Sequence, residues 1–199
     1  MKRILLAVIL GTFIAAPSWT LAQSSSYSEN HVEVGVFADY FRLSQTDPNI
    51  NFVGVGGRLG FSLHPNVQLE AEMSYDFRRN FTNTFSNGIT TQFVRTGVRP
   101  LTALFGPKFQ TGSGPFRAFV TGKVGFINFD TSNQSAPAGF TNSLGAVTSG
   151  DTRFALYPGG GVEGFWGPFG LRLEAGDEIY FDNGGQNNLK VTFGPTFRF

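Results

Sequence analysis

Apolar and polar residues alternate one by one along much of this chain. The clearest stretch covers residues 67–77, where Val67 and every second residue up to Phe77 are apolar. The intervening positions are Gln68, Glu70, Glu72, Ser74 and Asp76. A β-strand places alternate residues on opposite faces, whereas a helix would put Glu70 and Met73 on the same side. The pattern therefore predicts a strand with one apolar and one polar face.

The same alternation recurs seven more times. It predicts eight strands, at about 31–43, 51–63, 67–77, 93–110, 115–129, 152–165, 169–181 and 188–199. Three of them are less regular, those at about 93–110, 152–165 and 169–181. In the first of these, the apolar residues change from even-numbered to odd-numbered positions between Val98 and Leu101. This change of face indicates a β-bulge near Arg99-Pro100. Asp177 shares the parity of Leu171 and Leu173, so either it lies above an apolar band or Gly176 marks a second bulge.

The connections between these strands alternate in length. Long polar segments are expected at 44–50, 78–92, 130–151 and, shortest of the four, 182–187. Tight turns are expected at 64–66, 111–114 and 166–168. Long loops at one end and short turns at the other are typical of transmembrane β-barrels. The expected fold is all-β, an eight-stranded antiparallel up-and-down transmembrane barrel.

The N-terminal segment has the layout of a secretory signal peptide. Lys2 and Arg3 precede an apolar run over 4–16, and Thr20-Leu21-Ala22 offers small residues for cleavage. The run is shorter than the roughly 20 residues that a spanning helix needs. We expect a signal peptide at 1–22, a barrel domain at 23–199, no transmembrane helix and no further periplasmic domain.

Composition narrows the function classes. Charged residues make up 15% of the chain, with 15 basic and 14 acidic side chains, and there is no cysteine. The balance argues against a nucleic-acid-binding protein, which usually has a basic face. The lack of cysteine excludes a disulfide scaffold and Cys-ligated metal sites. The 26 glycines and 23 phenylalanines fit a β-protein with an apolar outer surface.

Two kinds of barrel fit eight alternating strands. A soluble ligand-binding barrel keeps apolar residues inside, whereas a membrane barrel has an apolar exterior and a polar filling. Export, together with a polar parity rich in glycine and opposite charges, favours the membrane arrangement. Small side chains and ion pairs suit the narrow interior of an eight-stranded barrel.

Several short motifs carry a resemblance to a known family. They are Glu70–Phe77, Gly159–Glu163, Leu171-Arg172-Leu173-Glu174 and the closing Phe193–Phe199. Residues 31–199 resemble the small OmpA/OmpX-type barrels of bacterial outer membranes. The resemblance implies an outer-membrane location, contact with outer-membrane lipid and lipopolysaccharide, and recognition by the barrel-insertion machinery. It also implies that Phe193, Phe197 and Phe199 act as the assembly signal.

The polar parity places fifteen charged side chains in the lumen. Five of them lie outside the network predicted below and are Asp39, Asp76, Lys123, Glu178 and Lys190. The other ten are predicted to form an ion-pair network that plugs the barrel, and they are Glu33, Arg58, Glu70, Glu72, Lys108, Arg117, Glu163, Arg172, Glu174 and Arg198. The alternative is a set of independent, hydrated charges that line a small pore.

The turn lengths also predict which charges face one another. Arg58 is expected opposite Glu72, Glu163 opposite Arg172, and Lys108 opposite Arg117. The last is a like-charge pair, which Glu70 and Glu163 would flank.

The sequence gives little support for a catalytic site. The two histidines, His31 and His64, map to the turn end of the barrel, with no serine and acid partner assured by spacing. We therefore expect no catalytic, cofactor or metal site, no nucleic-acid partner, and a structural or surface-interaction role. The alternatives are a small-solute pore and, less favoured, a soluble periplasmic ligand-binding barrel.

Overall fold

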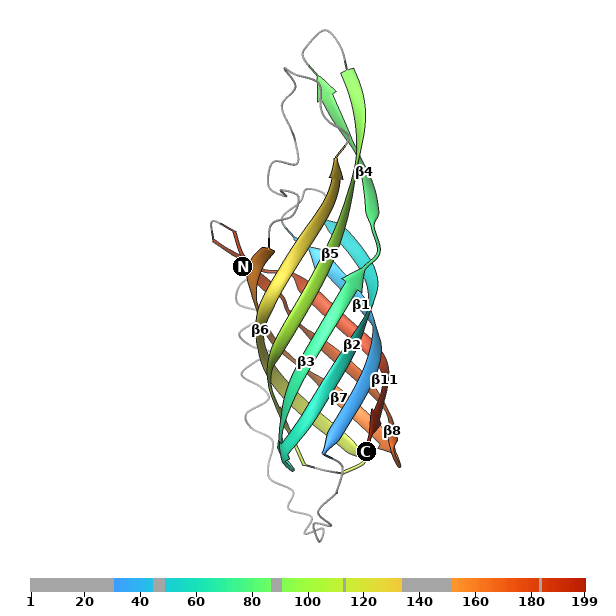
Figure 1. Cartoon of the computed structure of the whole chain (residues 1–199), viewed down its shortest axis with the longest axis vertical. Helices are drawn as coiled ribbons and strands as arrows, with labels where there is room; N and C mark the ends of the chain where they lie inside the picture. The colour runs from blue at the N-terminus through green and yellow to red at the C-terminus, as the bar shows by residue number, and fades with distance from the viewer. Residues whose placement is uncertain (1–30, 45–48, 87–90, 113, 134–151, 183) are drawn as a thin grey trace, which may run out of the picture.

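The computed structural model describes residues 31–44, 49–86, 91–112, 114–133, 152–182 and 184–199 (Figure 1). The expected signal peptide at 1–22 lies outside the described residues, as does most of the expected loop 130–151. Within the described ranges, no helix is long and apolar enough to cross a bilayer.

The described chain consists almost entirely of strands and their connections. The strands are β1 (Val32–Leu43), β2 (Ile50–His64), β3 (Val67–Asp76), β4 (Arg79–Ser86), β5 (Thr91–Gln110), β6 (Phe116–Asn133), β7 (Thr152–Trp166), β8 (Phe169–Asp177), β9 (Ile179–Phe181), β10 (Gly185–Gln186) and β11 (Leu189–Arg198).

Eight of these strands close into an antiparallel barrel. The ring runs β1-β2-β3-β5-β6-β7-β8-β11, and β11 pairs with β1 from Glu33↔Arg198 to Arg42↔Leu189. The short strand β9 continues the line of β8 along β7, and β10 pairs with β9. The predicted eight-stranded antiparallel barrel is therefore confirmed.

The two ends of the barrel differ. The end with the short turns and Phe199 is called the lower end here, and the end with the long connections is called the upper end (Figure 1). At the upper end β4 pairs with β5 from Arg79↔Val98 to Ser86↔Thr91, and this hairpin rises beyond the barrel. The expected loop at 78–92 is therefore wrong for most of its length. Strand β6 likewise continues to Asn133, four residues past its expected end.

The predicted bulge near Arg99-Pro100 is also wrong. β5 keeps one register against β6 from Thr96↔Asn133 to Gln110↔Phe119. The irregularity lies on the neighbouring chain segment, because four steps from Tyr75 to Arg79 face three steps from Leu101 to Val98. The apolar parity switches because Val98 and Leu104 both point inward and are buried.

Asp177 lies on the outward face without a bulge beside it. β8 keeps its register through Gly176 against both β7 and β11. The Asp177 carboxylate accepts a hydrogen bond of 2.8 Å from the backbone N–H of Asn188. Of the two sequence-based explanations, the position at the upper end of the strand is the one observed.

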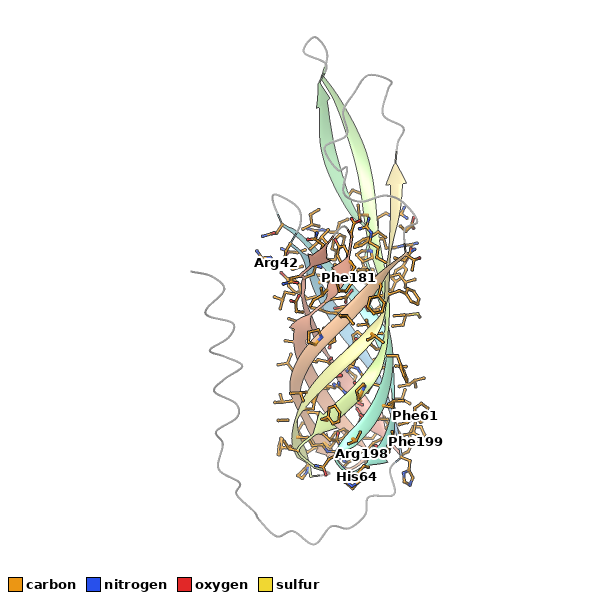
Figure 2. All side chains as sticks on the ribbon, turned by 90° about the vertical axis from the view of Figure 1, so that its left-hand side faces the viewer. Arg42, Phe61, His64, Phe181, Arg198 and Phe199 are labelled. Atoms are coloured by element: carbon orange, nitrogen blue, oxygen red, sulfur yellow. The ribbon has the colours of Figure 1, made fainter. Side chains whose placement is uncertain are left out.

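The barrel is inverted relative to a soluble protein. Large apolar side chains on the outward parity are exposed, and Val36, Phe105 and Leu173 are typical. Charged side chains on the inward parity are buried. Figure 2 shows side chains covering the outer wall between Arg42 and Phe181 at the upper end and Phe61 and Phe199 at the lower end. An apolar exterior around a charged interior is the arrangement of a membrane-spanning barrel.

Close strand contacts require glycine at particular inward positions. A Cβ on Gly106 would lie 2.2 Å from the carbonyl oxygen of Gly122. A Cβ on Gly194 would lie 2.0 Å from the carbonyl oxygen of Val36. These residues let the wall curve tightly around its charged filling.

Candidate functional site

The candidate site is the lower half of the lumen, where inward positions of seven strands bring charged side chains together. Nine of the ten predicted network residues are buried there, and the tenth, Arg198, is half-buried at the lower mouth. The strands that supply the nine are β1, β2, β3, β5, β6, β7 and β8, so their charges converge from almost every side of the ring.

Arg172 lies at the centre of this cluster. Its Nη1 and Nη2 atoms donate to the two carboxylate oxygens of Glu70, the second at 2.9 Å. Its Nε and Nη2 atoms also donate to Glu174 at 3.1 and 2.7 Å. The guanidinium carbon lies 4.0 Å from the ring centroid of Phe119. Arg172 therefore combines a bidentate ion pair with a cation–π contact, both of which hold the guanidinium plane in one orientation.

Two lysines each contact three carboxylates. Lys108 Nζ lies 3.0 Å from Glu163, 3.4 Å from Glu70 and 3.9 Å from Glu33. Lys123 Nζ lies 2.6 Å from Glu72, 3.0 Å from Glu174 and 3.3 Å from Glu70. The sequence placed Lys123 in the lumen but left it out of the network, although its contacts are as extensive as those of Lys108.

Arg58 contacts two of the same carboxylates as Lys123. Its Nη2 atom lies 3.0 Å from Glu72 and 3.0 Å from Glu174. Five acidic and five basic side chains thus make one continuous layer, which we call the ion-pair layer. It consists of Glu33, Glu70, Glu72, Glu163 and Glu174 with Arg58, Lys108, Arg117, Lys123 and Arg172.

The register accounts for two of the three predicted charge pairs. Arg58 faces Glu72 and Glu163 faces Arg172, as expected. The expected pair of Lys108 with Arg117 is wrong, because Lys108 faces Thr121 and Arg117 faces Glu163. The β5–β6 connection is wider than four residues, since Thr111 N donates to Ala118 O. This offset moves the two like charges apart.

Arg117 and Arg198 lie at the lower mouth. Arg117 Nη1 is 3.5 Å from Glu163, and its guanidinium lies over the ring of Phe165. Arg198 also lies over Phe165, and it donates from Nε to the carbonyl oxygen of Gly167. Among the described contacts Arg198 has no ion pair, so the structure leaves it outside the ion-pair layer.

A second charged group lies between the ion-pair layer and the upper end. Lys190 Nζ contacts Glu178 at 2.9 Å, the Ser74 hydroxyl at 3.0 Å and Asp39 at 3.5 Å. Asp76 is buried on the same inner wall, two strands away from Asp39 across Gly54. These residues were expected in the lumen, and they continue its charged filling upward.

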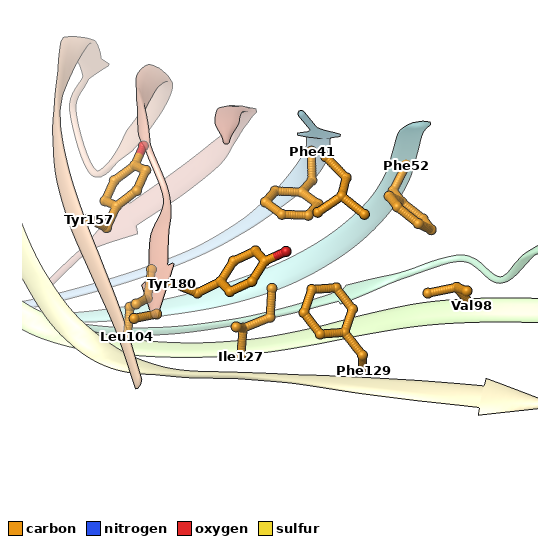
Figure 3. Packing of buried hydrophobic residues seen from close by; sticks show 10 residues of the cluster. Phe41, Phe52, Val98, Leu104, Ile127, Phe129, Tyr157 and Tyr180 are labelled. Carbon is orange, nitrogen blue, oxygen red and sulfur yellow. The ribbon is translucent and has the colours of Figure 1, made fainter. Parts of the chain in front are cut away.

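The upper lumen holds a feature that the sequence analysis missed. Ten buried apolar side chains pack together inside the barrel (Figure 3). We call them the apolar cap, and they are Phe41, Leu43, Phe52, Val98, Leu104, Ile127, Phe129, Ala155, Tyr157 and Tyr180. Phe129 meets Tyr180 edge to face at 5.4 Å. The parity switch at Val98 was the available signal, because it marks the point where inward residues change from polar to apolar.

Arg153 was also missed, and it lies at the upper edge of the apolar cap. Its guanidinium lies over the rings of Phe129 and Tyr180 and contacts Asp182 at 3.2 Å.

The two histidines lie away from the lumen. His64 is exposed at the lower end (Figure 2), and His31 precedes β1 at the same end. His64 Nδ1 accepts a hydrogen bond from the backbone N–H of Asn66. Across the part of the chain that the structure describes, no three His, Cys, Asp or Glu side chains are arranged to hold a metal ion.

Comparisons with known proteins agree with this geometry. No protein-family model and no curated protein sequence matches the chain significantly. Several solved structures are similar in fold, including those of two bacterial proteins. The attachment invasion locus protein Ail of Yersinia pestis, in complex with the heparin analogue sucrose octasulfate, gives a TM-score of 0.53 at 12% identity, over 85% of this chain and 97% of Ail. Neisserial surface protein A gives a TM-score of 0.54 at 10% identity, over 84% of this chain and 97% of that protein.

These likenesses show the fold. The chain has the fold of the small outer-membrane β-barrels, as its sequence predicts.

Proposed function

We propose that this protein is an integral outer-membrane barrel with a closed lumen, and that its role is structural or is carried out by its extracellular surface. It is proposed to have no catalytic activity. The short turns and both ends of the barrel domain would face the periplasm, and the β4–β5 hairpin would face outward from the cell.

One observation carries the proposal of a closed lumen. The side chains of Glu70, Lys108, Glu163 and Lys123 have 0% of their surface exposed to solvent. Charges that line a water-filled pore keep contact with water, because removing a charge from water is costly unless it is paired. In the ion-pair layer the neighbouring side chains have replaced that water.

The apolar cap supports the same conclusion independently. Its lower members Leu104 and Tyr157 meet the ion-pair layer at Glu72 and Lys123, and the rest of it continues toward the upper end. Phe52, Ile127 and Phe129 within it are fully buried. An ion that entered from the upper end would have to displace packed aromatic rings. The lumen therefore has two barriers of different chemistry in series.

The surface role is assigned to the hairpin of β4 and the upper part of β5. In the described part of the chain β4 pairs only with β5, so its second edge has unpaired backbone groups. Such an edge can accept an extended segment of a partner. Replacing residues 80–96 with a short turn should leave the barrel folded and closed while removing any surface binding.

The assembly signal is a separate part of the proposal. Outward Phe193 and Phe199 are exposed, and Phe197 lies between Phe169 and Phe199 with ring centroids 5.0 and 5.5 Å apart. We infer that the barrel-insertion machinery reads this aromatic column. Phe197→Ser should lower the amount of protein recovered in the outer membrane, whereas the control Phe105→Ser should lower it much less.

Two measurements test the proposed function. Membrane fractionation with a heat-modifiable gel shift should recover the folded barrel in the outer membrane, and recovery in the soluble periplasm without detergent would favour the soluble alternative. Planar-bilayer recording should give no large steady conductance, and such a conductance would favour the small-solute pore.

A further inference from the structure

Charged side chains are rare on the outer wall, and all of them lie at one end. Among outward strand positions with described side chains, the charged residues are Arg42, Arg99, Asp130 and Asp177. Each lies in the upper part of its strand. The lower outward wall is apolar down to residues such as Leu63 and Phe109. The upper end therefore marks the boundary where the apolar wall gives way to charge.

Two of these residues belong to a compact group that we call the rim cluster, made of Tyr75, Arg78, Arg99 and Asp130. Arg99 Nη2 lies 2.6 Å from Asp130 Oδ2, and Arg78 Nη2 lies 3.0 Å from the same oxygen. Arg99 Nη1 donates to the Tyr75 hydroxyl, and its guanidinium lies 4.9 Å from the Tyr75 ring centroid. One carboxylate thus holds two guanidinium groups side by side.

The rim cluster has an excess of positive charge that remains open to the surroundings. The side chains of Arg78 and Arg99 are 41% and 31% exposed. Each guanidinium has five N–H donors, of which these contacts use only one or two. An anion that approaches from outside can therefore receive hydrogen bonds from both arginines at once, in the forked geometry that suits phosphate.

The wall directly below the rim cluster is apolar. Next to Arg99 along β5 come Leu101, Ala103 and Phe105 on the same outward face. Met73 on β3 and Phe126 on β6 flank Ala103 and are 58% and 43% exposed. A ligand that binds here meets guanidinium donors at one end and an apolar surface at the other. A free phosphate ion would use only the first of these, whereas a lipid uses both.

We propose that the rim cluster is a binding site for the phosphate of a phosphorylated lipid headgroup, namely that of lipopolysaccharide in the leaflet around the upper end. The acyl chains lie along the apolar wall beside Leu101 and Met73, and the phosphate lies between Arg78 and Arg99. Tyr75 and Asp130 position the two guanidinium groups. The inference rests on the proposed outer-membrane location.

The test uses the full-length protein extracted from the membrane fraction in detergent and stripped of bound lipid. Binding of lipopolysaccharide is titrated for the wild type, for Arg78→Gln/Arg99→Gln and for the control Arg42→Gln. Arg42 is an outward arginine at the same end of the barrel but on β1, outside the rim cluster. Heat-modifiable migration verifies that every variant is folded. Dephosphorylated lipopolysaccharide and inorganic phosphate are titrated as separate probes.

The wild type and Arg42→Gln should bind lipopolysaccharide with equal affinity, and the double variant should bind it about tenfold or more weakly, because two charge-assisted contacts are lost. Dephosphorylated lipopolysaccharide should bind the wild type as weakly as intact lipopolysaccharide binds the double variant. Equal binding by all three proteins, or undiminished binding of the dephosphorylated lipid, would overturn the proposal. Inorganic phosphate that bound as tightly as the lipid would overturn the lipid assignment. If the protein fractionates in the outer membrane but fails these binding tests, the lipid-binding proposal is overturned and the proposed function is not.

Discussion

Glu70 and Arg172 join opposite walls of the barrel. Glu70 is on β3 and Arg172 is on β8, which lie four strands apart in either direction around the eight-stranded ring. Both oxygens of Glu70 accept from the Arg172 guanidinium, and the two side chains are buried. This contact fixes the width of the lumen and anchors the layer of charges around it.

Removing one partner of this pair should destabilise the fold. In Glu70→Gln the side chain keeps its shape, but Arg172, Lys108 and Lys123 lose one of the carboxylates that offset their buried charge. Breaking a buried ion pair in this way costs about 3–5 kcal/mol. The free energy of unfolding, measured by urea titration of the barrel in detergent or lipid, checks this value.

A double-mutant cycle separates the pair from its surroundings. Glu70→Gln/Arg172→Gln should cost clearly less than the sum of the two single substitutions, because no unpaired charge remains at the centre. Strictly additive costs would mean that Glu70 and Arg172 do not interact across the lumen.

A charged side chain on the outer wall should destabilise the barrel strongly at mid-height and only slightly near the lower end. Val55 lies near the middle of β2 and faces outward, and Leu63 lies at the lower end of the same face. Val55→Arg should cost about 2–4 kcal/mol in a lipid bilayer and Leu63→Arg about 0–1 kcal/mol. Equal and small costs for the two substitutions, measured as unfolding free energies in liposomes, would show that the wall does not face lipid.

Gly106 should not tolerate even a methyl group. A Cβ at this position meets the carbonyl oxygen of Gly122 and the Cα of Lys123, whereas a Cβ at Gly122 meets nothing within 4 Å. Gly106→Ala should therefore lower the free energy of unfolding by about 1–3 kcal/mol, through overpacking. The matched Gly122→Ala should change it by less, and equal effects would contradict the observed close approach of β5 and β6.

Much of the architecture could be predicted from the sequence because each face of each strand has a distinct environment. Glu70 and Glu72 alternate with Ala71 and Met73, and that alternation determines both the strand and its inward face. The turn at Pro65 and the turn at Gly167 are short enough to fix the registers of Arg58 with Glu72 and of Glu163 with Arg172. Strand number, strand direction and the identity of the lumen charges all follow from these local signals.

Two features could not be predicted from the alternation of polar and apolar residues and the turn lengths. The apolar cap is made of inward residues that look outward when polarity alone is used to assign the face, as at Val98 and Leu104. The β5–β6 register depends on the backbone path of residues 111–118, which Gly112 and Gly114 leave open. The partners of Lys108 and Arg117 therefore differ from those that the turn length suggested.

The apolar cap should act as a barrier that opens when its large side chains are replaced with small ones. Phe41 and Phe129 are both at most 1% exposed and belong to this cluster. The double substitution Phe41→Ala/Phe129→Ala removes two aromatic rings from the upper lumen, at a stability cost of about 3–5 kcal/mol for each ring. A milder variant, Phe41→Leu/Phe129→Leu, keeps the barrel folded if the alanine variant unfolds. The loss of the barrier is checked by increased access of a small polar thiol reagent to a cysteine placed at Thr192, whose hydroxyl accepts a hydrogen bond from Arg58 in the ion-pair layer. Phe105→Ala on the outer wall is the control.

The closed lumen is tested most directly by single-channel recording in a planar bilayer. Heat-modifiable, folded wild-type protein should insert without producing a steady conductance across the physiological range of voltage. A variant that lacks both barriers, Phe41→Ala/Phe129→Ala combined with Glu70→Gln/Arg172→Gln, should produce discrete openings under the same conditions. A large steady conductance from the wild-type barrel would show that the lumen is open.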